Sequence, residues 1–126
     1  MDKIVHFEIP TKDPARASAF YSKAFGWQIT QIPNFDYWGV MTTESDKDGR
    51  PTSPGAINGG MGKVNDVLKV PTVTVSVADI DNALANIEKL GGKVAEKKTA
   101  VGNMGFTAYF TDTEGNVIGL WQNASG

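Results

Sequence analysis

The sequence predicts an α+β fold in which two tandem βαβββ modules form a curved mixed sheet around a cleft. Three observations lead to this prediction: strands with alternating apolar and polar residues, two helices with clear start and stop residues, and a second half that repeats the first. After a shift of 66 residues, five positions of the first half meet identical residues: Asp13, Ala17, Ala19, Lys23 and Gly26. We therefore expect one domain of residues 1–126, with modules at about 1–62 and 68–126 and a connector at 63–67.

The first module opens with a strand and a helix. Apolar Val5, Phe7 and Ile9 alternate with His6 and Glu8, which is the period of a half-buried strand. A helix at about 14–25 follows, with Asp13 as its N-cap, Pro14 in its first turn and Gly26 as its stop. Its apolar stripe consists of Ala17, Phe20, Tyr21 and Ala24.

The remaining elements complete both modules. Strands are expected at 27–32, 35–42 and 56–61, with a mobile surface loop at 44–55 that is rich in charge, Gly and Pro. In the second module we expect a strand at 72–77, a helix that starts at the N-cap Asp79 and ends at 91–92, and strands near 93–99, 105–111 and 116–122. Glycines in the strand at 56–61 indicate a close approach by another group.

Composition narrows the class of protein. The chain has 126 residues, 40% of them hydrophobic, and a formal charge of −2, which excludes a disordered chain and gives no basic footprint for nucleic acid. It has no cysteine and one histidine, so thiolate metal sites, disulfides and sites of several imidazoles within one chain are excluded. With no apolar run long enough to cross a bilayer and no signal peptide, we expect a cytoplasmic protein.

Alternation also indicates which sheet faces are polar. If Val5, Phe7 and Ile9 pack on the first helix, His6 and Glu8 lie on the opposite face. In the second module, the equivalent polar residues are Thr72, Thr74 and Ser76. Curved sheets would direct both faces into a shared cleft that could bind a small molecule, and the alternative is a solvated face.

Two segments carry a resemblance to a known family. Residues 13–27, DPARASAFYSKAFGW, resemble the first-helix signature of the vicinal oxygen chelate superfamily, and residues 110–121, FTDTEGNVIGLW, resemble its closing segment. This superfamily includes glyoxalase I, bleomycin-resistance proteins and extradiol dioxygenases. The resemblance covers essentially the whole chain and implies the same glyoxalase/bleomycin resistance/dioxygenase-like fold.

The resemblance also implies where a metal would bind. The four ligand positions of the superfamily's metal enzymes fall on His6, Asn58, Thr72 and Gly119, and only His6 is a competent ligand. We therefore expect no metal and no other cofactor. The alternative is a weakly bound divalent metal at His6, with Glu8 on the same face as a second ligand. His6 could instead act as a general acid or base oriented by Glu8, or have a structural role.

Small and aromatic residues suggest how a ligand would be held. Gly119 and the pair 59–60 would leave space in the cleft, and Trp38 and Trp121 could stack on a planar ligand. Tyr37 and Phe35 are near in sequence, and aromatic residues on strands can equally belong to the core. The predicted ligand-binding residues are Trp38, Asn58, Thr72, Thr74, Tyr109, Gly119 and Trp121, and His6 and Glu8 are the candidate catalytic residues.

The leading hypothesis is a cytoplasmic, homodimeric protein that binds an unknown small molecule without a resident metal, as the resemblance to bleomycin-resistance proteins implies. The alternative is a glyoxalase-like lyase or isomerase that uses His6. A module that serves only as a scaffold is the third possibility. No nucleic acid or membrane partner is expected.

Overall fold

The computed structural model describes residues 1–124 and divides the chain into two compact units. One unit comprises residues 6–71, and the other comprises residues 1–5 together with the described residues from 72 onward. Residues 125–126, the end of the predicted second module, lie outside the described residues. Each unit is described by itself below.

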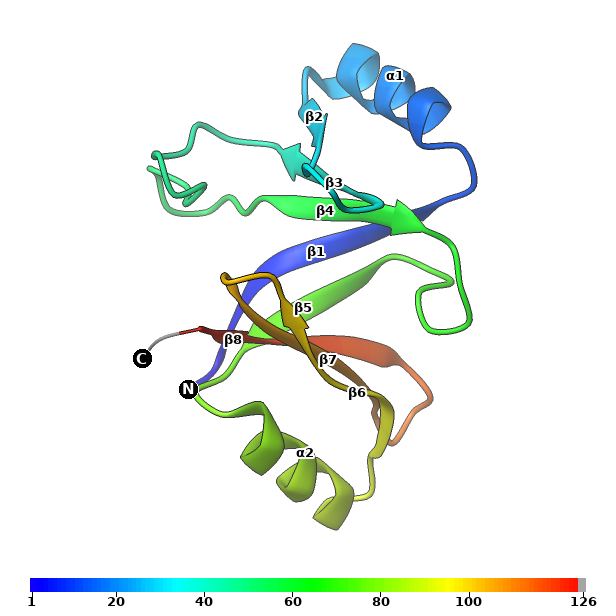
Figure 1. Cartoon of the computed structure of the whole chain (residues 1–126), viewed down its shortest axis with the longest axis vertical. Coiled ribbons are helices and arrows are strands. Elements are labelled where there is room, and N and C mark those ends of the chain that lie inside the picture. The colour runs from blue at the N-terminus through cyan, green and yellow to red at the C-terminus, as the bar shows by residue number, and fades with distance from the viewer. Residues whose placement is uncertain (125–126) are drawn as a thin grey trace. The chain divides into compact units, whose positions relative to one another are not determined.

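The unit of residues 6–71 contains five elements (Figure 1): β1 (Lys3–Thr11, which begins in the other unit), α1 (Pro14–Phe25), β2 (Gln28–Gln31), β3 (Tyr37–Met41) and β4 (Gly59–Lys63). Its strands lie in the order β2-β3-β4-β1. The β1–β4 pair is parallel and the β2–β3 and β3–β4 pairs are antiparallel. The predicted βαβββ order and mixed sheet are confirmed here.

The second unit has the same arrangement. It contains β5 (Thr72–Ser76), α2 (Ile80–Lys89), β6 (Lys93–Val101), β7 (Gly105–Thr111) and β8 (Val117–Asn123), with strands in the order β5-β8-β7-β6. The β5–β8 pair is parallel, and the β6–β7 and β7–β8 pairs are antiparallel. Element for element, this order matches that of the first unit, and the α+β class is confirmed.

Local signals set the bounds of α1 as predicted. The Asp13 carboxylate accepts a hydrogen bond from the Arg16 amide at 3.1 Å, which satisfies one of the first free N–H groups of the helix. Gly26 ends the helix with φ of 74°, and its amide donates to the Ser22 carbonyl at 2.9 Å. Only glycine adopts this left-handed conformation without strain, so residue 26 fixes the end of α1.

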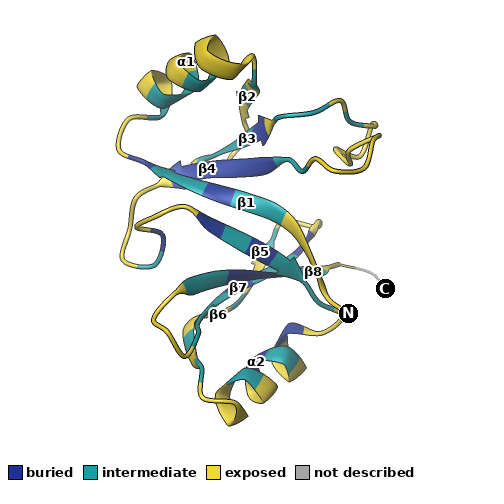
Figure 2. Cartoon of the chain, turned by 180° about the vertical axis from the view of Figure 1, so that it is seen from behind, coloured by how far each residue is buried: buried dark blue, intermediate teal, exposed yellow. Residues whose placement is uncertain are grey.

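The two helices bury very different amounts of side chain. In α2, Ile80 and Leu84 are buried and pack with Ala108 and Leu120, whereas α1 has no buried residue (Figure 2). The predicted buried stripe of α1 is wrong at Phe20, which is 63% exposed, and at Ala24, which is also exposed.

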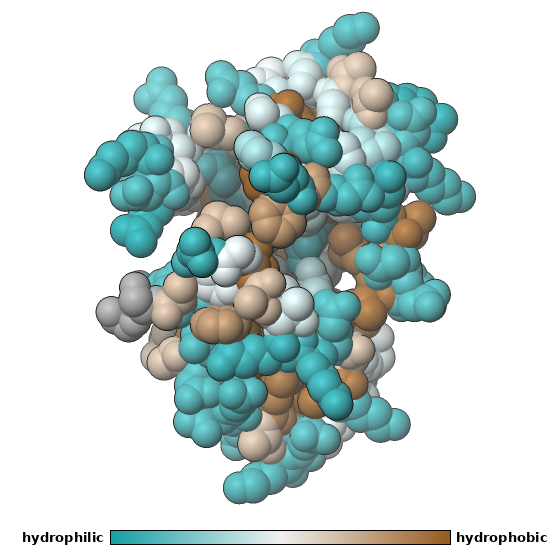
Figure 3. Space-filling model, in the orientation of Figure 1, coloured by the Kyte–Doolittle hydropathy of each residue, from teal (hydrophilic) through white to brown (hydrophobic). Residues whose placement is uncertain are grey.

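Tyr21 is the aromatic residue of the predicted stripe that packs inward in α1. It stacks on Trp27 with ring centroids 5.1 Å apart, and Trp27 in turn contacts Phe7 of β1. Phe20 contacts Tyr21 edge-on, with centroids 5.2 Å apart, and the rest of its ring faces solvent. Hydrophilic residues make up most of the molecular face in Figure 3, with apolar residues exposed between them.

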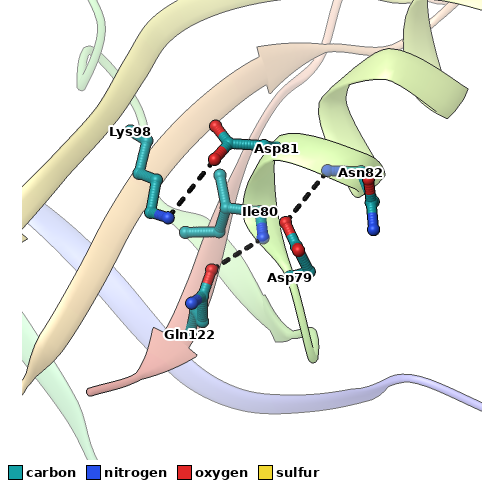
Figure 4. Close-up of polar contacts among 6 residues, drawn as sticks. All are labelled: Asp79, Ile80, Asp81, Asn82, Lys98 and Gln122. Atoms are coloured by element: carbon teal, nitrogen blue, oxygen red, sulfur yellow. Dashed lines mark hydrogen bonds and ion pairs between the residues drawn. The ribbon is translucent and has the colours of Figure 1, made fainter. Parts of the chain in front are cut away.

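The start of α2 is fixed to the sheet as well as capped (Figure 4). Asp79 accepts from the Asn82 amide at 3.1 Å, and the Gln122 side chain of β8 accepts from the Ile80 amide at 2.8 Å. Lys98 of β6 forms an ion pair with Asp81 at 3.3 Å. These contacts hold the first turn of α2 against β6 and β8.

In the described part of the chain, neither helix is long and apolar enough to cross a membrane.

We predict that the two helices contribute unequally to the free energy of unfolding, because they bury different amounts of side chain. Ile80→Ala should lower the free energy of unfolding by about 2–4 kcal/mol, because it leaves a cavity in a packed core. Phe20→Ala should change it by no more than about 0.5 kcal/mol, because the ring is mostly in solvent. Urea unfolding measures both variants, and a loss above about 2 kcal/mol for Phe20→Ala would contradict this description of α1.

Candidate functional site

One face of the sheet in the unit of residues 6–71 carries the polar residues of β1. Strand pairing places Glu8 beside Gly60 of β4, and Gly60 beside Gly39 of β3, so these three residues share that face. His6 and Tyr37 lie two residues from Glu8 and Gly39 and therefore share it too. Glu8 is 6% exposed, and His6 and Tyr37 are half-buried.

The side chains of His6, Glu8 and Tyr37, called the polar anchor below, form a connected network. Tyr37 Oη donates to Glu8 Oε2 at 3.2 Å, and His6 Nε2 lies 3.0 Å from the same Oη. A phenol has one proton, so when that proton is donated to Glu8 the imidazole must donate through Nε2–H. His6 Nδ1 then carries a lone pair, and it makes no hydrogen bond to any residue in the described part of the chain.

Burial decides the charge state of His6. Removal from water lowers the pKa of the His6 imidazole from 6.5 to about 4, because the charged form loses more hydration than the neutral form. His6 is therefore neutral at pH 7. A neutral imidazole linked to a phenol and a carboxylate can accept a proton at Nδ1 or orient a ligand by hydrogen bonding.

Glycines in β4 make this network possible. A Cβ built on Gly60 would overlap the Tyr37 hydroxyl, and one built on Gly59 would lie 2.5 Å from the Phe7 ring on the other face. The predicted close approach to these glycines is confirmed, and Tyr37 and Phe7 are the approaching groups. The expectation that the pair 59–60 leaves empty space is wrong, because these rings fill it.

Two residues of this unit with a predicted ligand-binding role do not join the network of His6, Glu8 and Tyr37. Trp38 pairs with Met61, which pairs with Ile9, so the indole lies on the face opposite His6. The Asn58 side chain accepts from the Thr42 and Thr43 amides and donates to Ser45 Oγ at 2.6 Å. Asn58 therefore holds the start of the loop at 44–55 and has no capacity left for a ligand.

That loop is itself internally bonded. Asp46 accepts from the amides of Asp48 and Arg50 at 2.9 and 3.0 Å, and Ser45 pairs with Pro51 in an isolated antiparallel bridge. The predicted loop at 44–55 is therefore held by its own hydrogen bonds, in part through the Asp46 carboxylate. Its mobility stays a prediction.

The other unit brings most of its predicted site residues onto one face. Thr74 of β5 pairs with Gly119 of β8, which pairs with Tyr109 of β7, and Trp121 lies two residues from Gly119. Thr72 lies two residues before Thr74, and its hydroxyl donates to the Val117 carbonyl. Sequence periodicity therefore identified a real common face here.

Little space remains at Gly119. A Cβ added there would lie 2.7 Å from Thr74 Oγ1 and 3.4 Å from the Tyr109 ring, so these two side chains already occupy the region. Thr74 Oγ1 is buried without a hydrogen-bond partner. The Trp121 ring covers Gly105, and its Nε1 donates to Asn123 at 2.8 Å.

Comparison with known proteins identifies the family. Residues 3–120 match the model of the Glyoxalase/Bleomycin resistance protein/Dioxygenase superfamily. The chain belongs to this superfamily. A glyoxylase-like domain-containing protein of Didymella fabae is 31% identical over 119 residues, which cover 90% of this chain and 88% of that protein.

Solved structures share the superfamily fold at low sequence identity. A variant of methylmalonyl-CoA epimerase from Streptomyces coelicolor, in complex with 2-nitronate-propionyl-CoA, has a TM-score of 0.64 and 19% identity, covering 98% of this chain and 95% of that chain. A superfamily member from Vibrio splendidus has a TM-score of 0.60 and 12% identity, covering 98% and 99%.

The residues at the superfamily's metal positions do not fit a metal. Asn58 is engaged by backbone amides, the Thr72 hydroxyl by a carbonyl, and Gly119 has no side chain. His6 directs Nε2 to Tyr37. Within residues 1–124, no three His, Cys, Asp or Glu side chains form a group that could hold an ion. Imidazole and anionic ligands provide affinity for transition metals, and this donor set supplies too few.

The low pKa of His6 predicts how stability depends on pH. Between about pH 6.5 and 4 the unfolded chain takes up a proton that the folded protein excludes, so the free energy of unfolding falls as the pH falls through this window. The decrease should amount to roughly 2–3 kcal/mol and should level off below the folded-state pKa.

Urea unfolding of the protein and of His6→Gln over this pH range measures the effect. The variant lacks the titrating group, so the difference between the two profiles isolates His6 from the carboxylates. Parallel profiles would show that the imidazole is not excluded from water.

Proposed function

We propose that this superfamily member binds a small molecule without a resident metal, and that the polar anchor on the sheet of residues 6–71 makes the specific contacts. The observation that carries the proposal is the network itself: a buried carboxylate, a phenol and a neutral imidazole joined on one sheet face. Binding sites typically combine a few fixed polar groups with an apolar surround.

The burial of the polar anchor supports ligand binding over the alternative of a solvated sheet face. A solvated sheet face would expose the Glu8 carboxylate to water, yet Glu8 is 6% exposed and is hydrogen-bonded to Tyr37. Networks of this kind restrict side-chain motion, so His6 Nδ1 is held in a defined direction as an acceptor. A ligand with an N–H or O–H group would complement it.

The common face of the other unit is the second surface that we assign to ligand contact. The Trp121 ring could stack on a planar group and the threonine hydroxyls could hydrogen-bond, so Thr72, Thr74, Tyr109, Gly119 and Trp121 keep this proposed role. Superfamily members from other organisms were crystallised with ligands, among them the epimerase complex with 2-nitronate-propionyl-CoA. A cytoplasmic homodimer stays a prediction.

Removing the Tyr37 hydroxyl tests the binding proposal. We predict that protein purified from its host without added ligand carries a non-covalent organic guest, detected by native mass spectrometry. Tyr37→Phe should lower guest occupancy about tenfold, because the loss of the hydroxyl disorders the hydrogen bonds of His6 and Glu8.

Trp38→Phe is the matched control, since this neighbour on β3 lies on the opposite face and should keep the guest. Equal occupancy in both variants, an empty wild-type protein, or a stoichiometric transition metal retained through dialysis would overturn the proposal.

Proton transfer is a second candidate function, and the direction of the hydrogen bonds from His6 through Tyr37 to Glu8 favours it. A substrate proton accepted at His6 Nδ1 would be matched by release of Nε2–H to Tyr37 Oη, and the phenol proton would pass to Glu8. The net change moves one proton from the substrate to the carboxylate. Such an activity would be a glyoxalase-like lyase or isomerase reaction.

A panel of glutathione hemithioacetals, catechols and epimerisable acyl-CoA esters tests this candidate. If one is turned over, His6→Gln should lower kcat by at least about 100-fold while the circular dichroism spectrum stays unchanged. Unchanged turnover in His6→Gln would exclude the relay, and no turnover with any substrate would leave binding as the function.

A further inference from the structure

We propose that Gly60 is a positioning residue of the polar anchor: it leaves the room in which the Tyr37 hydroxyl lies between His6 and Glu8. This inference deepens the proposed function and rests on it for its functional meaning. Gly60 itself touches neither a ligand nor a proton in this account. It acts only through the position of Tyr37.

The strand register shows why residue 60 has this effect. Tyr37 of β3 pairs with Gly62, and Gly62 pairs with Pro10 of β1, so the ring must cross β4 diagonally to reach Glu8, which lies beside Gly60. That diagonal path passes above residue 60. A Cβ there would overlap the Tyr37 hydroxyl and its carbon Cζ, which are the atoms nearest to β1.

The next glycine on the same face provides a comparison. Gly62 lies beside Tyr37 in the register, and a Cβ on it would lie 3.3 Å from Tyr37 Cδ1 and 3.6 Å from Leu68 Cδ2. Those separations require a shift of a few tenths of an ångström at most. Both glycines are buried and neither has a positive φ, so they differ chiefly in which part of the Tyr37 ring they face.

Displacement of Tyr37 has a chemical consequence at His6. The imidazole is half-buried and is neutral because it is shielded from water. The phenol is the hydrogen-bond partner that His6 Nε2 contacts. If an alanine methyl group at position 60 moves the phenol aside, water reaches the imidazole and the charged form is no longer disfavoured.

NMR titration of the single histidine tests the proposal without any ligand. Gly60→Ala should raise the pKa of His6 by at least about one unit toward 6.5, whereas Gly62→Ala should leave it near the wild-type value. Because the readout needs no guest molecule, its result is independent of whether the proposed binding function is right.

A double-mutant cycle shows whether Gly60 acts through Tyr37. Tyr37→Ala removes the ring, so adding Gly60→Ala to this variant should cause no further change in the His6 pKa. If Gly60→Ala alone fails to fold, the double variant should fold, since the ring that conflicts with the new methyl group is gone.

The proposal is overturned by any of three results. One is a wild-type His6 pKa in Gly60→Ala, the second is an equal shift in Gly62→Ala, and the third is a double variant that remains unfolded or shifts further than Tyr37→Ala. Each would show that residue 60 matters to the strand rather than to the anchor.

Discussion

Two polar side chains on β1 can be taken out of water only if other groups supply hydrogen bonds to them. Tyr37 of β3 does so with a single hydroxyl, which contacts His6 and Glu8 together. A buried carboxylate needs hydrogen bonds to offset its lost hydration, and the phenol supplies one of them to Glu8. The tautomer of His6 and the direction of Nδ1 follow from this contact, and burial keeps the imidazole neutral.

The same contact limits what His6 could offer to a metal. Nε2 is engaged by the phenol, so the lone pair of Nδ1 is the one that the imidazole has left. Asn58 is used by the loop at 44–55, and Gly119 has no donor atom. On the polar face of β1, the side chains instead form hydrogen bonds with one another through Tyr37. Such a face is suited to neutral hydrogen bonding or to proton transfer.

Local signals in the sequence predicted most of the fold. Asp13, Pro14 and Gly26 act on neighbouring backbone groups, so the bounds of α1 followed from the sequence, and alternation in β5 and β8 identified a shared face. Phe20 was misplaced because helical spacing groups residues on one side of a helix without showing which of them meets an apolar partner. In α1 that residue is Tyr21, whose ring stacks on Trp27.

The site was harder to predict because it depends on pairing between distant strands. Tyr37 and Trp38 are adjacent aromatic residues, and only the register of β3 with β4 decides which one faces His6. Two glycines on one face of β4, at positions 60 and 62, were the signal that a large ring crosses this strand. The hydrogen bonds of Asn58 with the loop at 44–55 could not be predicted, because they depend on the folded path of that loop.

The ¹⁵N chemical shifts of the only imidazole, measured at neutral pH in the unmodified protein, test the central contact most directly. We predict a neutral ring with the proton on Nε2 and an unprotonated Nδ1, because Tyr37 donates its own proton to Glu8. A charged ring would contradict the exclusion of the imidazole from water, and a neutral ring with its proton on Nδ1 would show that the phenol does not donate its proton to Glu8.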